Sequence, residues 1–240
     1  MKNKKKMKKK EKDDLVKLRK ELNNFKNENE YDEEIDGMNI LHYLSSKEQP
    51  DFEKIKLILN SKINLNSINA KNLKTAAHYL FENKEIDEII EPILKLKPDL
   101  NMRDKEKNDS LLVACNNPHL SYKSLKSLIN SKLDVNSENS HKWTPLHYIC
   151  STNNKDSEKK IRFLLKEKAK INHQDVHLQS PFLLYLSSSL AYSPQILSTL
   201  LENKADPILC DLYNQSPLSF ATKNSSFSKG HFYKIIFFFF

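Results

Sequence analysis

The stretch that decides the fold is Trp143-Thr144-Pro145-Leu146-His147-Tyr148. Threonine directly before proline predicts the start of a helix, because the threonine side chain can cap the helix and proline is favoured at the first helical position. The same arrangement recurs at Ser180-Pro181 and Ser216-Pro217. The chain therefore uses one kind of helix start more than once.

These helix starts recur along the chain with a period of about 35 residues. The positions equivalent to Leu146 are Leu41, Ala77, Leu111, Phe182 and Leu218, at intervals of 34 to 36 residues. A second apolar helix follows each of the first five starts and ends in an aliphatic pair: Ile58-Leu59, Ile93-Leu94, Leu128-Ile129, Leu164-Leu165 and Leu200-Leu201. Each pair is followed by an exit segment that begins with lysine: Lys62, Lys97, Lys132, Lys168 and Lys204. These three sets of equivalent positions, here called columns, share one period. They indicate stacked two-helix repeats, each burying its apolar side against its neighbours.

The repeat resembles that of the ankyrin family, whose unit has a T-P-L-H-x-A helix start, an L-L tail and a G-A-D-V-N exit. The resemblance covers residues 34–223, or about five full repeats and a half repeat. It implies an all-α solenoid of stacked helix–turn–helix repeats with short β-turn or hairpin connections. It also implies that the histidines of the start, here His42, His78 and His147, bond locally within the turn and the helix start.

The exits depart from the family pattern, because lysine stands where the family has a glycine in left-handed conformation. A residue with a Cβ atom in that conformation costs roughly 1 kcal/mol. We therefore expect a modestly stable or locally loosened solenoid.

The two ends fall outside the repeats. Residues 1–12 are expected to be a disordered lysine-rich tail, and residues 13–33 an N-terminal capping helix with apolar residues at helical spacing, or else a short coiled coil. Residues 224–240 are expected to be an irregular C-terminal tail. Either residues 235–240 pack as a crude second helix, or the chain is a piece of a longer protein.

Charge and composition limit the classes of function. The formal net charge is +8, of which residues 1–12 hold +7, so the remainder is nearly neutral and gives no reason to expect nucleic acid. The lysine run is consistent with a nuclear import signal, with electrostatic attachment to an anionic membrane, or with a solubilising tail. With no secretory signal, no stretch approaching the ~20 apolar residues of a membrane span, and three scattered cysteines, a cytoplasmic location is expected, with the nucleus as the alternative.

The sequence offers no catalytic, cofactor or metal motif. Two glycines in the whole chain argue against a phosphate-cradling loop, and no nucleophile elbow or dinucleotide fingerprint occurs. Cys115 and Cys150 occupy one column of successive repeats and are expected to be buried and structural. We therefore predict a protein that is not an enzyme and has no cofactor and no metal.

The ankyrin resemblance implies that partner proteins meet the turn tips and the inner helices. The predicted contact residues are Lys107, His141, Trp143, His177 and Tyr213 at the tips, and Tyr43, Tyr79 and Tyr148 on the inner helices. Two alternatives stay open, namely that Trp143 packs flat against a neighbouring turn and that the inner column packs between repeats. The predicted function is a monomeric, non-enzymatic protein–protein interaction module or scaffold. The alternative is a repeat segment of a larger enzyme, channel or signalling protein, acting as spacer or regulator.

Overall fold

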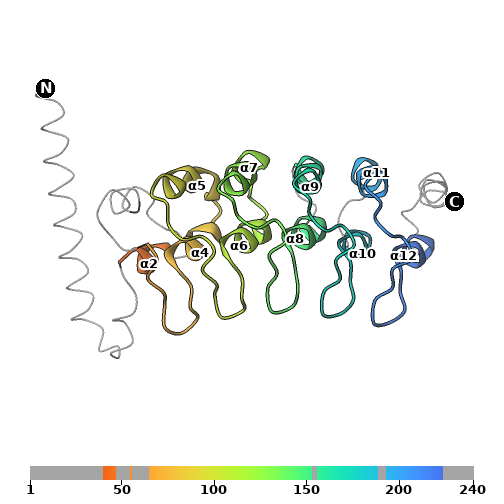
Figure 1. The fold of residues 1–240 in the computed structure, drawn as a ribbon, viewed down its shortest axis with the longest axis horizontal. Coiled ribbons are helices and arrows are strands. Elements are labelled where there is room, and N and C mark those ends of the chain that lie inside the picture. Colours follow the sequence, from red (N-terminus) through yellow and green to blue (C-terminus); the bar gives the residue numbers. More distant parts are fainter. Residues whose placement is uncertain (1–39, 47–54, 56–64, 153–155, 189–192, 224–240) are drawn as a thin grey trace, which may run out of the picture.

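Two parallel rows of short helices, with a series of loops along one side, form the structure (Figure 1). The computed structural model describes residues 40–46, 55, 65–152, 156–188 and 193–223. The inner row contains α2 (Ile40–Ser45), α4 (Ala76–Phe81), α6 (Ser110–Asn116), α8 (Pro145–Thr152), α10 (Pro181–Ser187) and α12 (Pro217–Lys223). The outer row contains α5 (Ile86–Lys95), α7 (Tyr122–Asn130), α9 (Ser157–Lys166) and α11 (Pro194–Glu202).

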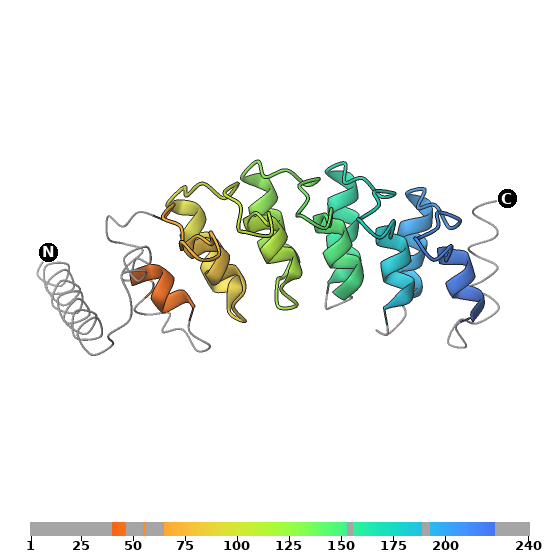
Figure 2. The same ribbon diagram turned by 90° about the horizontal axis from the view of Figure 1, so that it is seen from below.

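The predicted all-α solenoid of stacked helix–turn–helix repeats is confirmed. Each inner helix packs on the inner helices of the neighbouring repeats, and the outer helices stack in the same way (Figure 2). The predicted tail at 1–12, the capping helix at 13–33, the exit lysine Lys62 and the tail at 224–240 lie outside the described residues.

Several inner helices begin at residues whose side chains cap the first turn. Asp109 accepts a hydrogen bond from the backbone N–H of Leu112 (2.9 Å), and Ser180 accepts one from Leu183 (3.2 Å). These bonds satisfy N–H groups that the first turn of a helix leaves without a partner. The six or seven residues of most inner helices are too few to be stable alone, so these helices depend on the stack.

The exits are left-handed, as the comparison with the family unit predicted. The lysines that end the outer helices have positive φ: 52° at Lys97, 67° at Lys132, 68° at Lys168 and 65° at Lys204. This conformation turns the chain so that Ala169 donates from its backbone N–H to the carbonyl of Leu164 at 2.9 Å. Such a bond closes the end of a helix and satisfies one of its last carbonyls.

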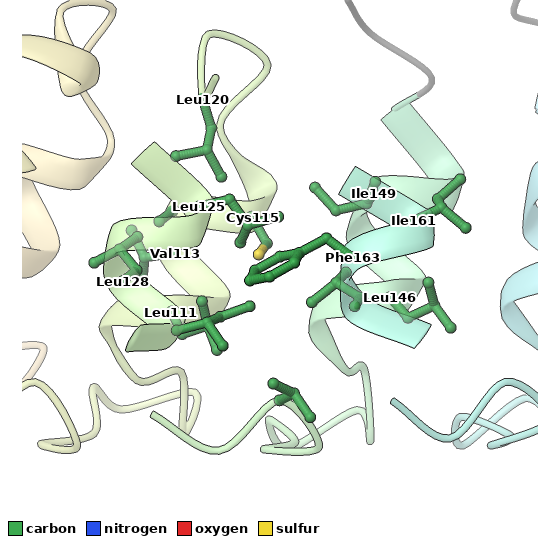
Figure 3. Close-up of a cluster of buried hydrophobic side chains, with 14 of the residues drawn as sticks. Leu111, Val113, Cys115, Leu120, Leu125, Leu128, Leu146, Ile149, Ile161 and Phe163 are labelled. Atoms are coloured by element: carbon green, nitrogen blue, oxygen red, sulfur yellow. The ribbon is translucent and has the colours of Figure 1, made fainter. Parts of the chain in front are cut away.

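The core runs as a continuous apolar layer between the two rows and from repeat to repeat. Figure 3 shows its centre, where the ring of Phe163 reaches from α9 toward the sulfur of Cys115 on α6. Leu111 and Leu146, which are one repeat apart, are both fully buried. Each interface between repeats therefore belongs to the same core, as expected when no repeat can bury its apolar side alone.

Buried polar side chains add bonds between repeats. Asn117 donates through Nδ2 to the carbonyls of Phe81 (2.9 Å) and Asn83 (2.7 Å) in the preceding repeat. Lys160 is completely buried, and its ammonium donates to the carbonyl of Leu120 at 2.8 Å. These bonds fix how one repeat sits on the next, because a buried polar group is costly without its partner.

Candidate protein-binding surface

Five loops, here called the finger loops, precede the inner helices α4 to α12 and project to one side of the solenoid (Figure 1). They comprise residues 69–74, 104–108, 139–143, 175–179 and 211–215. Each begins with an asparagine or aspartate that organises the loop: Asn69, Asp104, Asn139, Asp175 and Asp211. Oδ1 of Asp104, for example, accepts from the backbone N–H groups of Glu106 (2.9 Å) and Asn108 (2.8 Å).

These anchor residues were not among the residues singled out from the sequence. Their spacing of 35 or 36 residues equals the repeat period, so the same column comparison that located the helix starts could have found them. Short polar side chains that bond backbone N–H groups two and four residues ahead are typical of tight turns.

Each finger loop also contains one non-glycine residue in the left-handed conformation. These residues are Leu73, Lys107, Lys142, Leu178 and Asn214, with φ between 56° and 62°. In the loop that begins at Asp104, the N–H of Lys107 donates to the carbonyl of Asp104 at 2.9 Å. The bend at the tip is therefore held by the anchor residue at both its side chain and its carbonyl group.

Neighbouring finger loops are joined by backbone hydrogen bonds, one at each step along the row. Lys105 donates to Asn72 and Ser140 donates to Glu106, both at 2.8 Å. Val176 donates to His141 and Leu212 donates to His177, both at 3.1 Å. The tips thus form one continuous surface rather than separate loops.

Four of the predicted contact residues lie exposed on this row: Lys107, His141, His177 and Tyr213. Tyr213 has 79% of its surface exposed, the largest value among the exposed large hydrophobic residues of the described chain. Their role in binding stays a prediction, but they share one continuous surface.

Trp143 is held within the repeat interface. Its indole N–H donates to Oδ2 of Asp175, the anchor of the next finger loop, at 2.8 Å. The indole also stacks on His147, with ring centroids 6.1 Å apart, and meets the ring of Tyr148 at 4.9 Å. These contacts favour the alternative in which Trp143 packs against its neighbours, and its predicted contact with a partner remains untested.

The inner-helix tyrosines connect helices to finger loops. The hydroxyl of Tyr79 accepts from the amides of Asn69 and Asn72, both at 2.9 Å. The hydroxyl of Tyr148 accepts from Asn139 at 2.9 Å and donates to Asn108 at 3.4 Å. Both side chains are half-buried, so each serves packing and still presents part of its ring.

The pKa of the Tyr148 hydroxyl is raised to about 12, first because burial disfavours the phenolate and then because the Glu106 carboxylate lies nearby. The hydroxyl therefore stays protonated at neutral pH and acts as a hydrogen-bonding group. The third predicted inner residue, Tyr43, belongs to α2, and its side chain lies outside the described residues.

His78 and His147 make the local bond that the family resemblance implies through Nδ1, and each also reaches the next repeat through Nε2. Nδ1 of His147 accepts from the N–H of Thr144 (3.1 Å) and lies 2.8 Å from its hydroxyl, while Nε2 faces the carbonyl of Gln179 at 3.2 Å. Since a carbonyl only accepts, Nε2 must carry the proton and Nδ1 must be the acceptor. His78 repeats the pattern with Thr75 and Asn108.

Protonation of Nδ1 would break the bond to the threonine N–H. Burial lowers the pKa of His78 below its ordinary value and lowers that of His147 to about 4. Both ring nitrogens of each histidine are thus committed to holding the fold, which accounts for these residues without a general-base role.

The chemical character of the tips changes along the row. The loop at 104–108 carries Lys105, Glu106 and Lys107, and the loop at 139–143 carries Ser140, His141 and Lys142. The loops at 175–179 and 211–215 instead expose apolar side chains: Val176 (40% exposed), Leu178 (41%), Leu212 (59%) and Tyr213. The surface therefore has a charged half, formed by the loops at 104–108 and 139–143, beside an apolar half, formed by the loops at 175–179 and 211–215.

The described residues give little support for other kinds of site. They contain no group of three or more His, Cys, Asp or Glu side chains placed to hold a metal ion. Cys115 and Cys150 are buried, and burial raises the pKa of both thiols well above the usual range. Within the same residues, none of the helices has both the length and the apolar character needed to cross a membrane.

Comparison with known proteins identifies the repeats. Residues 78–175 match the family model for ankyrin repeats in three copies. These residues are therefore ankyrin repeats, which form a non-catalytic interaction fold. No curated protein matches the chain.

Proposed function

We propose that this repeat region is a non-enzymatic module that binds another protein through its row of finger tips and the adjoining inner helices. Ankyrin repeats are in general protein–protein interaction modules. The observation that carries the proposal is the backbone bonding of each finger loop to the next, which presents exposed tip residues on one preformed surface. A preformed surface loses little conformational entropy on binding, so more of the contact energy remains as affinity.

The apolar half of the surface supplies the driving force. Val176, Leu178, Leu212 and Tyr213 leave apolar area in water on two adjacent loops. Covering such area contributes about 25 cal/mol per Å², and exposed tyrosines are frequent hot spots of interfaces. The charged half at 104–108 favours a partner whose charges match it, which adds specificity more than affinity.

The test is affinity capture from the source cell with the whole chain as bait, quantified by mass spectrometry. The double variant His177→Ala, Tyr213→Ala changes two exposed tip side chains that make no side-chain hydrogen bond in the described structure. We expect it to lose most of the partner recovered by the wild type. The matched control is Lys126→Ala, Lys166→Ala, two exposed residues on α7 and α9 of the outer row, which should retain the partner.

Circular dichroism verifies that both variants keep the helical content of the wild type. If the tip variant and the control recover the same partners in the same amounts as the wild type, the finger surface is not the binding surface.

A further inference from the structure

A cavity of about 260 Å³ opens on the finger-loop side between the second and third described repeats. Its walls come from Asn72 and Lys74, from Leu112 and Val113 of α6, from Tyr148 of α8, and from four residues of one finger loop, Asp104, Lys105, Glu106 and Asn108. Sites for drug-sized ligands and cofactors have volumes of about 300 Å³ or more. This cavity is therefore suited to a single side chain of a binding partner.

At the cavity, a small residue stands in a column that carries tyrosine in both neighbouring repeats. Tyr79, Val113 and Tyr148 hold the same position in α4, α6 and α8, two residues after the column of Ala77, Leu111 and Leu146. Val113 is small, so it fills less of the space between the finger loop and the helix than its tyrosine neighbours do. Tyr148 then forms one wall of the opening.

The lining combines an apolar base with a negatively charged rim. Leu112 and Val113 are apolar and almost fully buried. Among the charged lining residues, Lys74 pairs with Glu82, and its ammonium lies 5.4 Å from the centre of the Tyr79 ring. Apart from that ion pair, the charged residues of the lining are two carboxylates, Asp104 and Glu106, and one lysine, Lys105.

The carboxylates act on the cavity wall itself. After burial, the charge of Glu106 is the largest influence that raises the pKa of Tyr148, and Asp104 adds to it. The space beside the Tyr148 ring is therefore at negative potential and stabilises a cation. Asn116 adds a side-chain amide group to the lining, and its oxygen can accept from a donor with several N–H groups.

We propose that this cavity binds an arginine side chain of the partner protein. The aliphatic part of the side chain lies on Leu112 and Val113, and the guanidinium lies against the ring of Tyr148 within reach of the Glu106 carboxylate. Arginine combines the three properties that the lining calls for: an apolar stem, a planar cation that stacks on aromatic rings, and several N–H donors. The proposal rests on the proposed function, since it names the chemistry by which the same surface recognises a protein.

The experiment uses N-acetyl-arginine amide as the probe, titrated into the whole ¹⁵N-labelled chain and followed by the chemical shifts of backbone and asparagine side-chain amides. We expect saturable shifts at Asn108, Val113 and Asn116. N-acetyl-citrulline amide has nearly the same shape without the charge. We therefore expect its affinity to be lower than that of the arginine probe by a factor of about ten or more, because a charge-assisted contact is lost.

Two variants locate the site. Val113→Tyr restores the ring that the neighbouring helices carry, so it should fill the cavity and abolish the shifts. Its matched control is Leu184→Tyr at the same position of α10, where the exposed fraction is 8% against 7% for Val113, and this control should bind the probe as the wild type does. Glu106→Gln changes an exposed side chain and leaves the fold intact, so it remains informative if Val113→Tyr fails to fold. It should weaken arginine binding several-fold and leave citrulline binding unchanged.

Equal shifts from arginine and citrulline, undiminished binding by a folded Val113→Tyr variant, or no saturable binding by the wild type would each overturn the proposal. The capture experiment with the finger-tip variants separates this failure from failure of the proposed function. If those variants lose their partner while the arginine probe does not bind, the module binds proteins but not through an arginine in this cavity.

Discussion

Replacement of the four described exit lysines by glycine should stabilise the protein. Lys97, Lys132, Lys168 and Lys204 have φ between 52° and 68°, a region that an L-residue with a Cβ atom enters at a cost of about 1–2 kcal/mol. Glycine enters it freely but loses about 0.5–1 kcal/mol more conformational entropy on folding than alanine does. The expected net gain is therefore about 0.5–1 kcal/mol per site.

The structure gives reasons for the four gains to add. All four side chains are exposed, so their removal costs little packing, and the helix-closing backbone bonds do not involve the side chain. The sites lie in different repeats and share no contact, which is the condition for additivity. The quadruple variant should be more stable by about 2–4 kcal/mol.

The assay is urea unfolding followed by circular dichroism at 222 nm, with the midpoint and slope fitted for each variant. The control Lys126→Gly makes the same chemical change within α7, where the backbone is helical and the side chain is exposed, so it should destabilise by about 1 kcal/mol. The reasoning is refuted if the quadruple variant unfolds at the same or a lower urea concentration than the wild type while the control behaves as expected.

Three further outcomes follow from buried groups. The pKa of His147 is lowered from 6.5 to about 4, so the neutral ring contributes its full stabilisation of the folded state above pH 6.5. The free energy of unfolding should fall by roughly 3 kcal/mol as the pH falls to about 4. A urea midpoint that is constant between pH 7.5 and pH 4.5 would contradict this. Trp143→Phe removes the indole donor to Asp175 and should lower the free energy of unfolding by about 1–3 kcal/mol; a change within measurement error would show that the bond is dispensable. A thiol reagent should modify the partly exposed Cys210 quickly in the native protein and the two buried cysteines only as fast as the protein unfolds, whereas rapid modification of all three thiols would mean that the core at Cys115 opens readily.

Much of the repeat architecture could be predicted from the sequence, because it depends on local features that recur. The column that contains Leu111, Leu146 and Phe182 indicated the stacking, and these three side chains proved to be fully buried. The Ser180-Pro181 start was predicted from the residues themselves and the left-handed exit at Lys168 from the family resemblance, and both are confirmed. The helix start is set by two residues in succession, whose preferences are strong enough to read without the neighbouring repeat.

The candidate binding surface depended on the tertiary structure to a greater degree. The sequence placed Lys107, His141 and Tyr213 at turn tips, but only the structure shows adjacent tips joined by backbone bonds into one surface. The role of Trp143 likewise changed once its indole was found bonded to Asp175.

The sequence by itself determined the repeat, its period, the two helices of each unit and the position of the turns. The tertiary structure decided the continuity of the finger row, the bonds of Trp143 and the cavity beside Val113. The physical reason is distance along the chain. Trp143 and Asp175 are 32 residues apart, and Val113 and Tyr148 are one repeat apart, so their contacts depend on how one repeat is stacked on the next. That stacking is fixed by the packing of whole helices and by backbone bonds, which no local pattern of side chains specifies.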